Sequence, residues 1–395
     1  MADIMVNLKA FQPDYGAESS DLALRLKCRA KGLTVNACAH ALFFCKLLQA
    51  TRSPKQKEEK KEDVSAFLQE PKDNQSLNLG IIGGGHIGKQ LAKTFLQLGG
   101  ISEKNIQIST RRPETLSEFH MVGVKCYYNN RQLVCWADVI FLCCLPSHLQ
   151  QICSEIHDAL QDHCIVYSLI TGIPLTRLKQ LLSFNSILRP QYKFVETDLF
   201  DIWLASRTVV DALKDPAVIQ ATCPCNPIRE VVVNREWLAA TFYAALNSYT
   251  KQGLSYAKTL LLFTEVCFPD DDTYGEDKSP PLLFCENFIN PTFASSLEPD
   301  DSFPWFDLTT VQRKDSPFSH LLATDKSFQD NIASLYCNML KVKFSKTKED
   351  SISVSFKKPS LSALLLNPTK PLTWGVAATC KSKVEEASST DSEDT

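Results

Sequence analysis

The run GGGHIG at 83–88 has the residue types and spacing of a turn that can hold a phosphate. It follows an apolar run, LNLGII at 77–82, and precedes a stretch whose apolar residues recur at helical spacing. Gly83 permits the tight turn, Gly85 lets the main chain approach a pyrophosphate, and Gly88 lets the helix pack closely on the strand. The anion would lie at the helix N-terminus, where free N–H groups and the helix dipole attract it.

Two residues between the last glycines, His86 and Ile87, belong to the same predicted phosphate turn. We expect His86 to face solvent beside the phosphates, and a catalytic His86 is the alternative. A glycine-rich turn without a ligand is a second alternative. Four later strand-like runs favour a dinucleotide-binding domain instead, because such a domain needs them in this order.

The second strand-like run, NIQIST at 105–110, indicates which dinucleotide is expected. Domains that bind NAD place a carboxylate at the end of this strand to accept hydrogen bonds from ribose hydroxyls. Here the strand ends on Thr110, Arg111 and Arg112, and no carboxylate occurs before Glu114. Guanidinium groups pair well with phosphate, so we predict NADP(H), which carries a 2′-phosphate. The alternative is that two exposed arginines merely open a helix.

Short β-rich runs alternate with helical runs over 77–185, which indicates βαβ units and a parallel sheet. We therefore predict an α/β fold, a Rossmann-type doubly wound parallel sheet with helices on both faces and an NADP-binding role. The other predicted strands are VKCYY at 124–128, DVIFLCC at 138–144 and HCIVYSL at 163–169. The predicted helices cover 86–98, 115–121, 147–160 and 174–182. A fragment from about Pro71 to Asn185 is predicted to bind the dinucleotide alone.

The chain before this domain divides in two by composition. Apolar residues at helical spacing over about 21–50 predict an N-terminal helical extension within 1–50. The charged run TRSPKQKEEKKED then predicts a linker over 51–76.

The chain after the domain divides into three parts. Helical patterns at 235–249 and 254–267 predict a second, mainly helical domain over 186–270. Residues rich in Pro, Asp and Ser follow, so we predict an irregular C-terminal region over 271–380. The acidic end predicts a disordered tail over 381–395.

Charge and composition argue against several classes of partner. With 42 basic and 45 acidic residues, the formal charge of -3 gives no reason to expect a nucleic acid. The longest early apolar stretch, 35–48, is shorter than the roughly 20 residues that span a bilayer, so no membrane association is expected. The fifteen cysteines suit free thiols in a reducing compartment, and the first twenty residues lack the pattern of a targeting signal. The expected location is the cytoplasm.

No metal site and no catalytic residue is predicted. Cys223 and Cys225 form a Cys-x-Cys pair, but no second pair follows at the spacing of a zinc site. The histidines and serines show no triad or nucleophile-elbow pattern.

Four segments together resemble the pyrroline-5-carboxylate reductase family: LGIIGGGHIGKQLAKTFLQLGG, NIQISTRRPE, ADVIFLCCLPSHLQQI and CIVYSLITGIPLTRLKQLL. They cover about 79–182 in the family's order and spacing. The resemblance implies an oxidoreductase that transfers hydride from NADPH to an imine or related carbonyl carbon. The substrate is an unknown small molecule.

The resemblance also implies further cofactor contacts. Cys144, Leu145 and Pro146 would border the nicotinamide ribose, and Thr171 and Gly172 would lie near the nicotinamide. Where the family usually has Val-Lys-Pro, this chain has Cys-Leu-Pro, so a lysine is missing.

The second half departs further from the family. The Ser-Gly-Ser-Gly-Pro and Pro-Gly-Gly-Thr-Thr runs that shape the family's substrate site are absent. Only the helices around 235–267 faintly resemble the family's dimerising domain, which leaves a homodimer through them as an expectation. Two functions therefore stay open: an NADP(H)-dependent oxidoreductase that transfers hydride to an imine or carbonyl substrate, or a catalytically inactive NADP(H)-binding sensor or scaffold.

Overall fold

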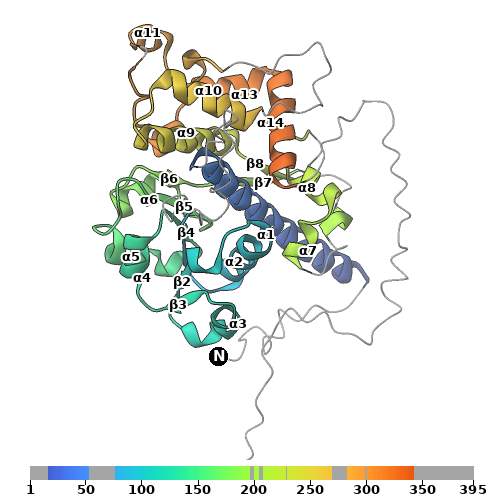
Figure 1. Cartoon of the computed structure of the whole chain (residues 1–395). Helices are drawn as coiled ribbons and strands as arrows, with labels where there is room; N and C mark the ends of the chain where they lie inside the picture. The colour runs from blue at the N-terminus through green and yellow to red at the C-terminus, as the bar shows by residue number, and fades with distance from the viewer. Residues whose placement is uncertain are drawn as a thin grey trace, which may run out of the picture. The chain divides into compact units, whose positions relative to one another are not determined.

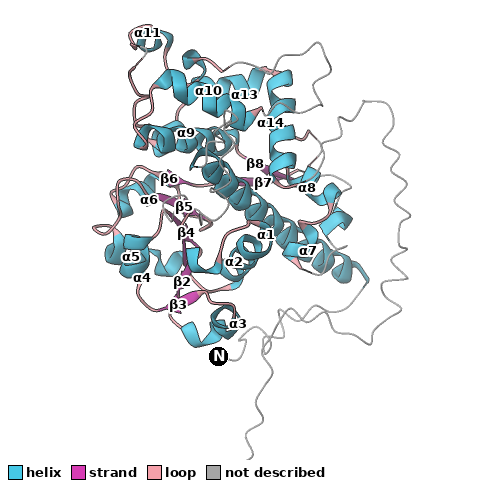
Figure 2. Cartoon of the chain, in the orientation of Figure 1, coloured by secondary structure: helices cyan, strands magenta, loops and turns pink. Residues whose placement is uncertain are grey.

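The structure is a computed structural model that describes residues 17–52, 76–195, 200–203, 208–227, 229–268, 283–298 and 300–341. A six-stranded parallel sheet in the order β3-β2-β1-β4-β5-β6 forms the nucleotide-binding part (Figures 1 and 2). Its strands are β1 (Leu79–Ile82), β2 (Ile106–Ser109), β3 (Lys125–Tyr127), β4 (Val139–Leu142), β5 (Ile165–Ser168) and β6 (Ile187–Leu188). The predicted Rossmann-type sheet is confirmed, and β6 is an additional strand.

Helices cover both faces of the sheet, as predicted. One face carries α2 (His86–Leu98), η6 (Pro113–Leu116) and α3 (Ser117–Met121), and the other carries α4 (Asn130–Trp136), α5 (Pro146–Ile156) and α6 (Leu175–Leu182). Strands β1, β2, β4 and β5 are buried along their whole length, which explains their continuous apolar runs. Strand order reverses between β1 and β4, and ligands of such sheets bind at this point.

The N-terminal helix α1 (Ala17–Arg52) belongs to the core of this fold rather than standing apart as an extension. Its Phe44 ring lies 5.5 Å from the Tyr167 ring of β5, measured between centroids. On its other side α1 packs against α9 (Arg235–Lys251). A helix that is apolar all round is typically buried in this way.

Helix α1 is longer than the apolar stretch 35–48, from which we expect no segment long enough to span a bilayer. The segment Ala23–Arg52 is long and apolar enough to cross a membrane. In this structure, however, 72% of its most apolar window is buried against the rest of the chain. Packing inside the protein therefore accounts for its composition.

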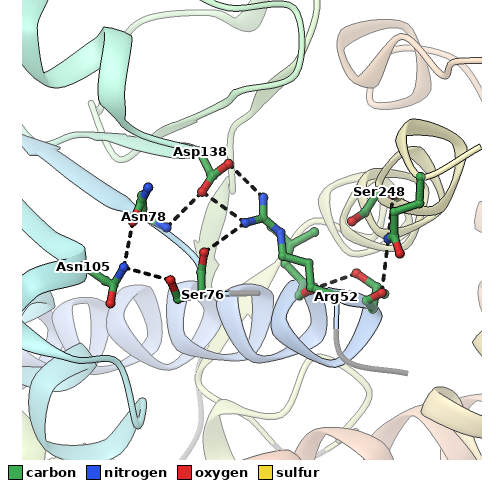
Figure 3. A network of polar contacts seen from close by, with 9 residues as sticks. Arg52, Ser76, Asn78, Asn105, Asp138 and Ser248 are labelled. Atoms are coloured by element: carbon green, nitrogen blue, oxygen red, sulfur yellow. Dashed lines mark hydrogen bonds and ion pairs between the residues drawn. The ribbon is translucent and has the colours of Figure 1, made fainter. Parts of the chain in front are cut away.

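The last turn of α1 is tied to the sheet by a polar network (Figure 3). The Arg52 guanidinium donates to the carboxylate of Asp138 at 3.0 and 3.1 Å and to the carbonyl oxygen of Ser76. The main-chain N–H of Asn78 donates to the same carboxylate at 3.0 Å. Burial alone would raise the pKa of Asp138, but the contacts with Arg52 and Asn78 outweigh it and lower the pKa below its ordinary value.

The second half of the described chain is mainly helical. Its helices include α7 (Val209–Ala212), α8 (Pro216–Thr222), α9 and α10 (Tyr256–Cys267), beside the antiparallel pair β7 (Tyr192–Phe194) and β8 (Val231–Val233). The predicted helices at 235–249 and 254–267 correspond to α9 and α10. Gly253 lies between them at a φ of +70°, a conformation that favours glycine.

The region 271–380 contains helices that its composition did not indicate. They are α11 (Pro291–Ala294), α12 (Leu308–Val311), α13 (Pro317–Thr324) and α14 (Lys326–Met339). The Asp and Ser residues that suggested loops are N-caps: Asp307, Ser316 and Asp325 each accept a hydrogen bond from a main-chain N–H of the first helical turn. Of the predicted linker over 51–76, residues 51 and 52 end α1, while residues 53–75 and the tail at 381–395 lie outside the described residues.

Candidate nucleotide-binding site

The glycine turn joins β1 to α2 with very little space beneath it. Gly83 has a φ of +112°, and a Cβ there would lie 2.8 Å from the main chain of Cys143. A Cβ on Gly88 would lie 2.0 Å from the carbonyl oxygen of Gly83. These two glycines are therefore required by the packing of α2 against the strand ends.

Gly85, in contrast to Gly83 and Gly88, has free space around its Cα atom. A Cβ at this position would meet nothing within 4 Å, so the absent side chain leaves open space above the turn. Gly85 is also the N-cap of the 13-residue helix α2, and no side chain caps that end. The helix start thus combines uncapped N–H groups with room for a ligand, which is the arrangement that binds a phosphate.

A cavity of about 510 Å³ opens over the turn and the neighbouring strand ends. Among the predicted cofactor-binding residues, its lining includes Gly83, Gly85, His86, Ile87, Thr110, Arg111, Arg112, Cys144 and Leu145. The structure thus brings the glycine turn, the end of β2 and the end of β4 around one space. The volume falls within the range typical of ligand pockets.

Four other predicted residues do not line this cavity. Gly88 is buried beneath the turn, and Pro146 is the first residue of α5. Thr171 and Gly172 follow β5 and are exposed, with Gly172 at a φ of +78°. Their contact with a nicotinamide stays a prediction from the resemblance.

Cationic groups gather at the end of β2. Arg111 and Arg112 are exposed on the cavity rim, and neither forms an ion pair with a carboxylate of the described chain. Lys89 of α2 reaches the same loop, where its ammonium donates to the carbonyl oxygen of Thr115 at 3.2 Å. An anion bound here would meet no competing acidic partner among these contacts.

A polar chain on the cavity wall was not predicted. The Ser109 hydroxyl donates to the Asn130 side-chain oxygen at 2.7 Å, and the Asn130 amide donates to Glu155 at 2.7 Å. The Gln151 amide donates to the other Glu155 oxygen at 3.1 Å. The cavity therefore does hold a carboxylate, but both of its oxygens already accept hydrogen bonds from protein groups.

Burial shifts the pKa of two titratable groups in the cavity lining. It lowers the pKa of His86, which favours the neutral imidazole. It raises the pKa of Cys144 to about 11, so this thiol stays protonated at neutral pH. Neither group has the properties of a charged catalyst.

Comparison with known proteins agrees with this geometry. Residues 78–169 match the family model described as NADP oxidoreductase coenzyme F420-dependent. The mouse (Mus musculus) protein NADP-dependent oxidoreductase domain-containing protein 1 is 37% identical over 356 residues, which cover 89% of this chain and 97% of that protein. The chain belongs to the family of this protein. Its nucleotide domain is thus an oxidoreductase domain that suits a nicotinamide cofactor.

Similarity to pyrroline-5-carboxylate reductases is confined to a shorter range. Pyrroline-5-carboxylate reductase 2 of Macaca fascicularis is 32% identical over 114 residues, 28% of this chain and 35% of that enzyme. Pyrroline-5-carboxylate reductase 3 of Danio rerio is 28% identical over 106 residues, 27% of this chain and 37% of that enzyme. This chain therefore spans only about a third of the length of these enzymes.

Solved structures of the same enzymes are also similar in part. The pyrroline-5-carboxylate reductase of Coxiella burnetii is 21% identical, with a TM-score of 0.29 over 48% of this chain and 76% of that chain. The Plasmodium falciparum enzyme with NADP bound is 13% identical, with a TM-score of 0.27 over 67% of this chain and 95% of that chain.

Proposed function

We propose that this protein is an NADP(H)-dependent oxidoreductase that transfers hydride between the cofactor and an imine or related carbonyl carbon of a small molecule. The observation that carries the proposal is the open space at Gly85, beside the uncapped start of α2 and next to Arg111 and Arg112. The nicotinamide supplies the hydride chemistry when it is bound, and the chain binds and orients it.

Each part of the site has a role in this proposal. The N–H groups at the start of α2 bind the pyrophosphate, and the space left by Gly85 admits it. Arg111 and Arg112 bind the 2′-phosphate as guanidinium–phosphate pairs. The main chain at Cys144 borders the nicotinamide ribose.

A second candidate is a catalytically inactive NADP(H)-binding sensor or scaffold. The cavity reaches Cys144 and Leu145 but not Thr171 or Gly172. Within the described residues that line it, Cys144 is a protonated thiol at neutral pH and His86 is kept neutral. A nucleotide cavity that does not reach the residues after β5, where the resemblance places the nicotinamide, favours this second function.

Turnover distinguishes the two functions. NADPH oxidation is followed with a panel of cyclic imines and keto acids, and Gly85→Trp, which fills the phosphate space, is the control without cofactor. Turnover by the wild type but not by Gly85→Trp supports the oxidoreductase. Binding of NADPH without turnover across the panel supports the sensor. Failure of the wild type to bind NADPH contradicts both functions.

Reduction of pyrroline-5-carboxylate itself is expected to be weak or absent, because the family's glycine-rich substrate runs are missing. A kcat on the order of 10 per second with this substrate would contradict that expectation.

We also propose a cytoplasmic location, supported by the fourteen cysteines of the described residues, which form no disulfide with one another. A homodimer through the helices around 235–267 stays a prediction. Twelve of the 17 residues of α9 are buried within one chain, so such a dimer would have to use α10, where Leu261 is 59% exposed.

A further inference from the structure

A second cavity, of about 420 Å³, lies in the mainly helical half of the protein. It is lined by the β7–β8 pair, residues 224–227 with Arg229, the start of α9 and the junction of α13 with α14. It shares no lining residue with the nucleotide cavity. Its chemistry can therefore be considered by itself.

The lining of this cavity is strongly cationic. Its charged members are Lys193, Arg229, Arg235, Lys326 and a single carboxylate, Glu236. Glu236 lies 3.8 Å from Arg235 and also accepts a hydrogen bond from Asn234. None of the other three cations forms an ion pair within the described part of the chain.

Arg229 is the least exposed of these cations. It is half-buried, and its guanidinium donates to the carbonyl oxygens of Cys223 and Pro224. Those oxygens are neutral acceptors, and no carboxylate of the described residues forms an ion pair with this partly desolvated charge. A charge held in this way is costly unless an anion joins it.

The start of α9 adds to the positive potential. Asn234, the N-cap of this 17-residue helix, lines the cavity but makes no side-chain cap hydrogen bond. Its side-chain oxygen instead accepts from the main-chain N–H of Gln191 at 2.8 Å. The N-terminal dipole of a long helix thus points toward the same space as the four cations.

We propose that this cavity binds a small organic anion carrying two or more phosphate or carboxylate groups. Guanidinium and ammonium groups from four separate segments suit a multivalent ligand better than a single charge. Val232, Leu238 and Leu322 supply an apolar wall for its carbon skeleton. The site stands apart from the nucleotide cavity, so it does not depend on the proposed oxidoreductase function.

Calorimetry with the full chain tests the proposal, with pyrophosphate and citrate as the two probes. The chain is first saturated with NADPH, so that the probes cannot bind at Arg111 and Arg112. If NADPH does not bind, the Arg111→Ala/Arg112→Ala variant is used instead to remove these two cations. We expect one anion site. The tighter of the two probes shows whether phosphate or carboxylate is preferred.

Exposed lysines provide variants that should not disturb folding. Replacing both Lys193 and Lys326 by Gln should weaken anion binding by roughly tenfold or more, the scale of one hydrogen bond to a charged group. Lys104→Gln and Lys258→Gln, also exposed but outside both cavities, should leave it unchanged. Arg229→Gln should weaken it further, and the lysine variants decide if that protein does not fold.

Two results would overturn the proposal. The first is absence of binding for both probes, and the second is equal binding by the Lys193/Lys326 variant and the controls. A more specific form of the first result is binding of an acidic peptide such as polyglutamate when neither small anion binds, which would make the cavity a contact site for a protein segment.

Discussion

The Nε2 atom of His40 lies 2.8 Å from the carbonyl oxygen of Thr222, a residue 182 positions further along the chain. A carbonyl oxygen can only accept, so Nε2 donates and Nδ1 is left to accept from the Tyr192 hydroxyl at 3.1 Å. The ring is buried between α1 and the later helices, and this burial lowers the pKa of His40 to about 3. His40 is therefore a neutral link between distant segments.

The first prediction concerns stability in mild acid. The unfolded chain protonates His40 near its ordinary pKa of about 6.5, whereas the folded protein resists protonation down to about 3. Between these values the unfolded state binds more protons than the folded state. The free energy of unfolding should therefore decrease as the pH is lowered, by up to about 1.4 kcal/mol per pH unit. Above about 6.5 this contribution is fully present.

Urea denaturation at about pH 7.5 and about pH 5.5 measures this effect. His40→Gln should be less stable at the higher pH but should lose the part of the pH dependence that comes from His40. His120→Gln, at an exposed position, should keep the wild-type dependence. An unchanged pH dependence in His40→Gln would show that this ring is not the group that titrates.

The second prediction separates two glycines of the turn. Gly88→Ala should destabilise the protein by at least about 2 kcal/mol, because the new Cβ would lie 2.0 Å from the Gly83 oxygen. Gly85→Ala should cost less than about 1 kcal/mol, since its Cβ meets nothing within 4 Å, yet it should weaken NADPH binding. Thermal unfolding and calorimetry measure the two effects. Normal NADPH affinity in a folded Gly85→Ala protein would mean that the phosphate does not approach this residue.

The third prediction concerns the choice between NADPH and NADH. A hydrogen bond to a charged group contributes roughly 1.5 to 3 kcal/mol, so Arg111→Ala/Arg112→Ala should weaken NADPH binding by about ten- to a hundredfold. NADH binding should change little, and the difference should shrink at high salt. Arg177→Ala, exposed on α6 and outside the cavity, is the matched control. Equal affinity of the wild type for both nucleotides would withdraw the assignment of NADP(H).

The fourth prediction concerns α1. Its buried side chains belong to the same core cluster as β1, β4 and β5, so a chain that lacks α1 would expose one face of the sheet. We therefore expect a protein starting at Ser76 to aggregate or to bind a hydrophobic dye, and the fragment Pro71 to Asn185 to behave likewise. Tight NADPH binding by that soluble fragment would instead support the simpler expectation from the sequence.

The sheet could be predicted because its information is local. Strands β1, β2, β4 and β5 are short apolar runs separated by helical ones, and a glycine turn marks the start. The two functions of the turn, close packing at Gly88 and open space at Gly85, also follow from glycine chemistry alone.

The features that could not be predicted from the sequence depend mostly on contacts between distant segments. Helical spacing in α1 predicts a helix but not what covers it, and its partner α9 comes about 200 residues later. Asn130 and Glu155 reach the nucleotide cavity from helices on the far side of the sheet, and no sequence pattern joins them to Ser109. The later helices were missed because their Asp and Ser caps also suit loops.

The burial of α1 has a consequence for how the chain is made. The ribosome delivers this apolar helix before the segments that cover it, and two of them, α9 and α14, are synthesised about 200 to 300 residues later. At about 5 to 20 residues per second, α1 stays without these later partners for on the order of ten seconds or more. During that interval a chaperone that binds apolar helices would protect it from aggregation.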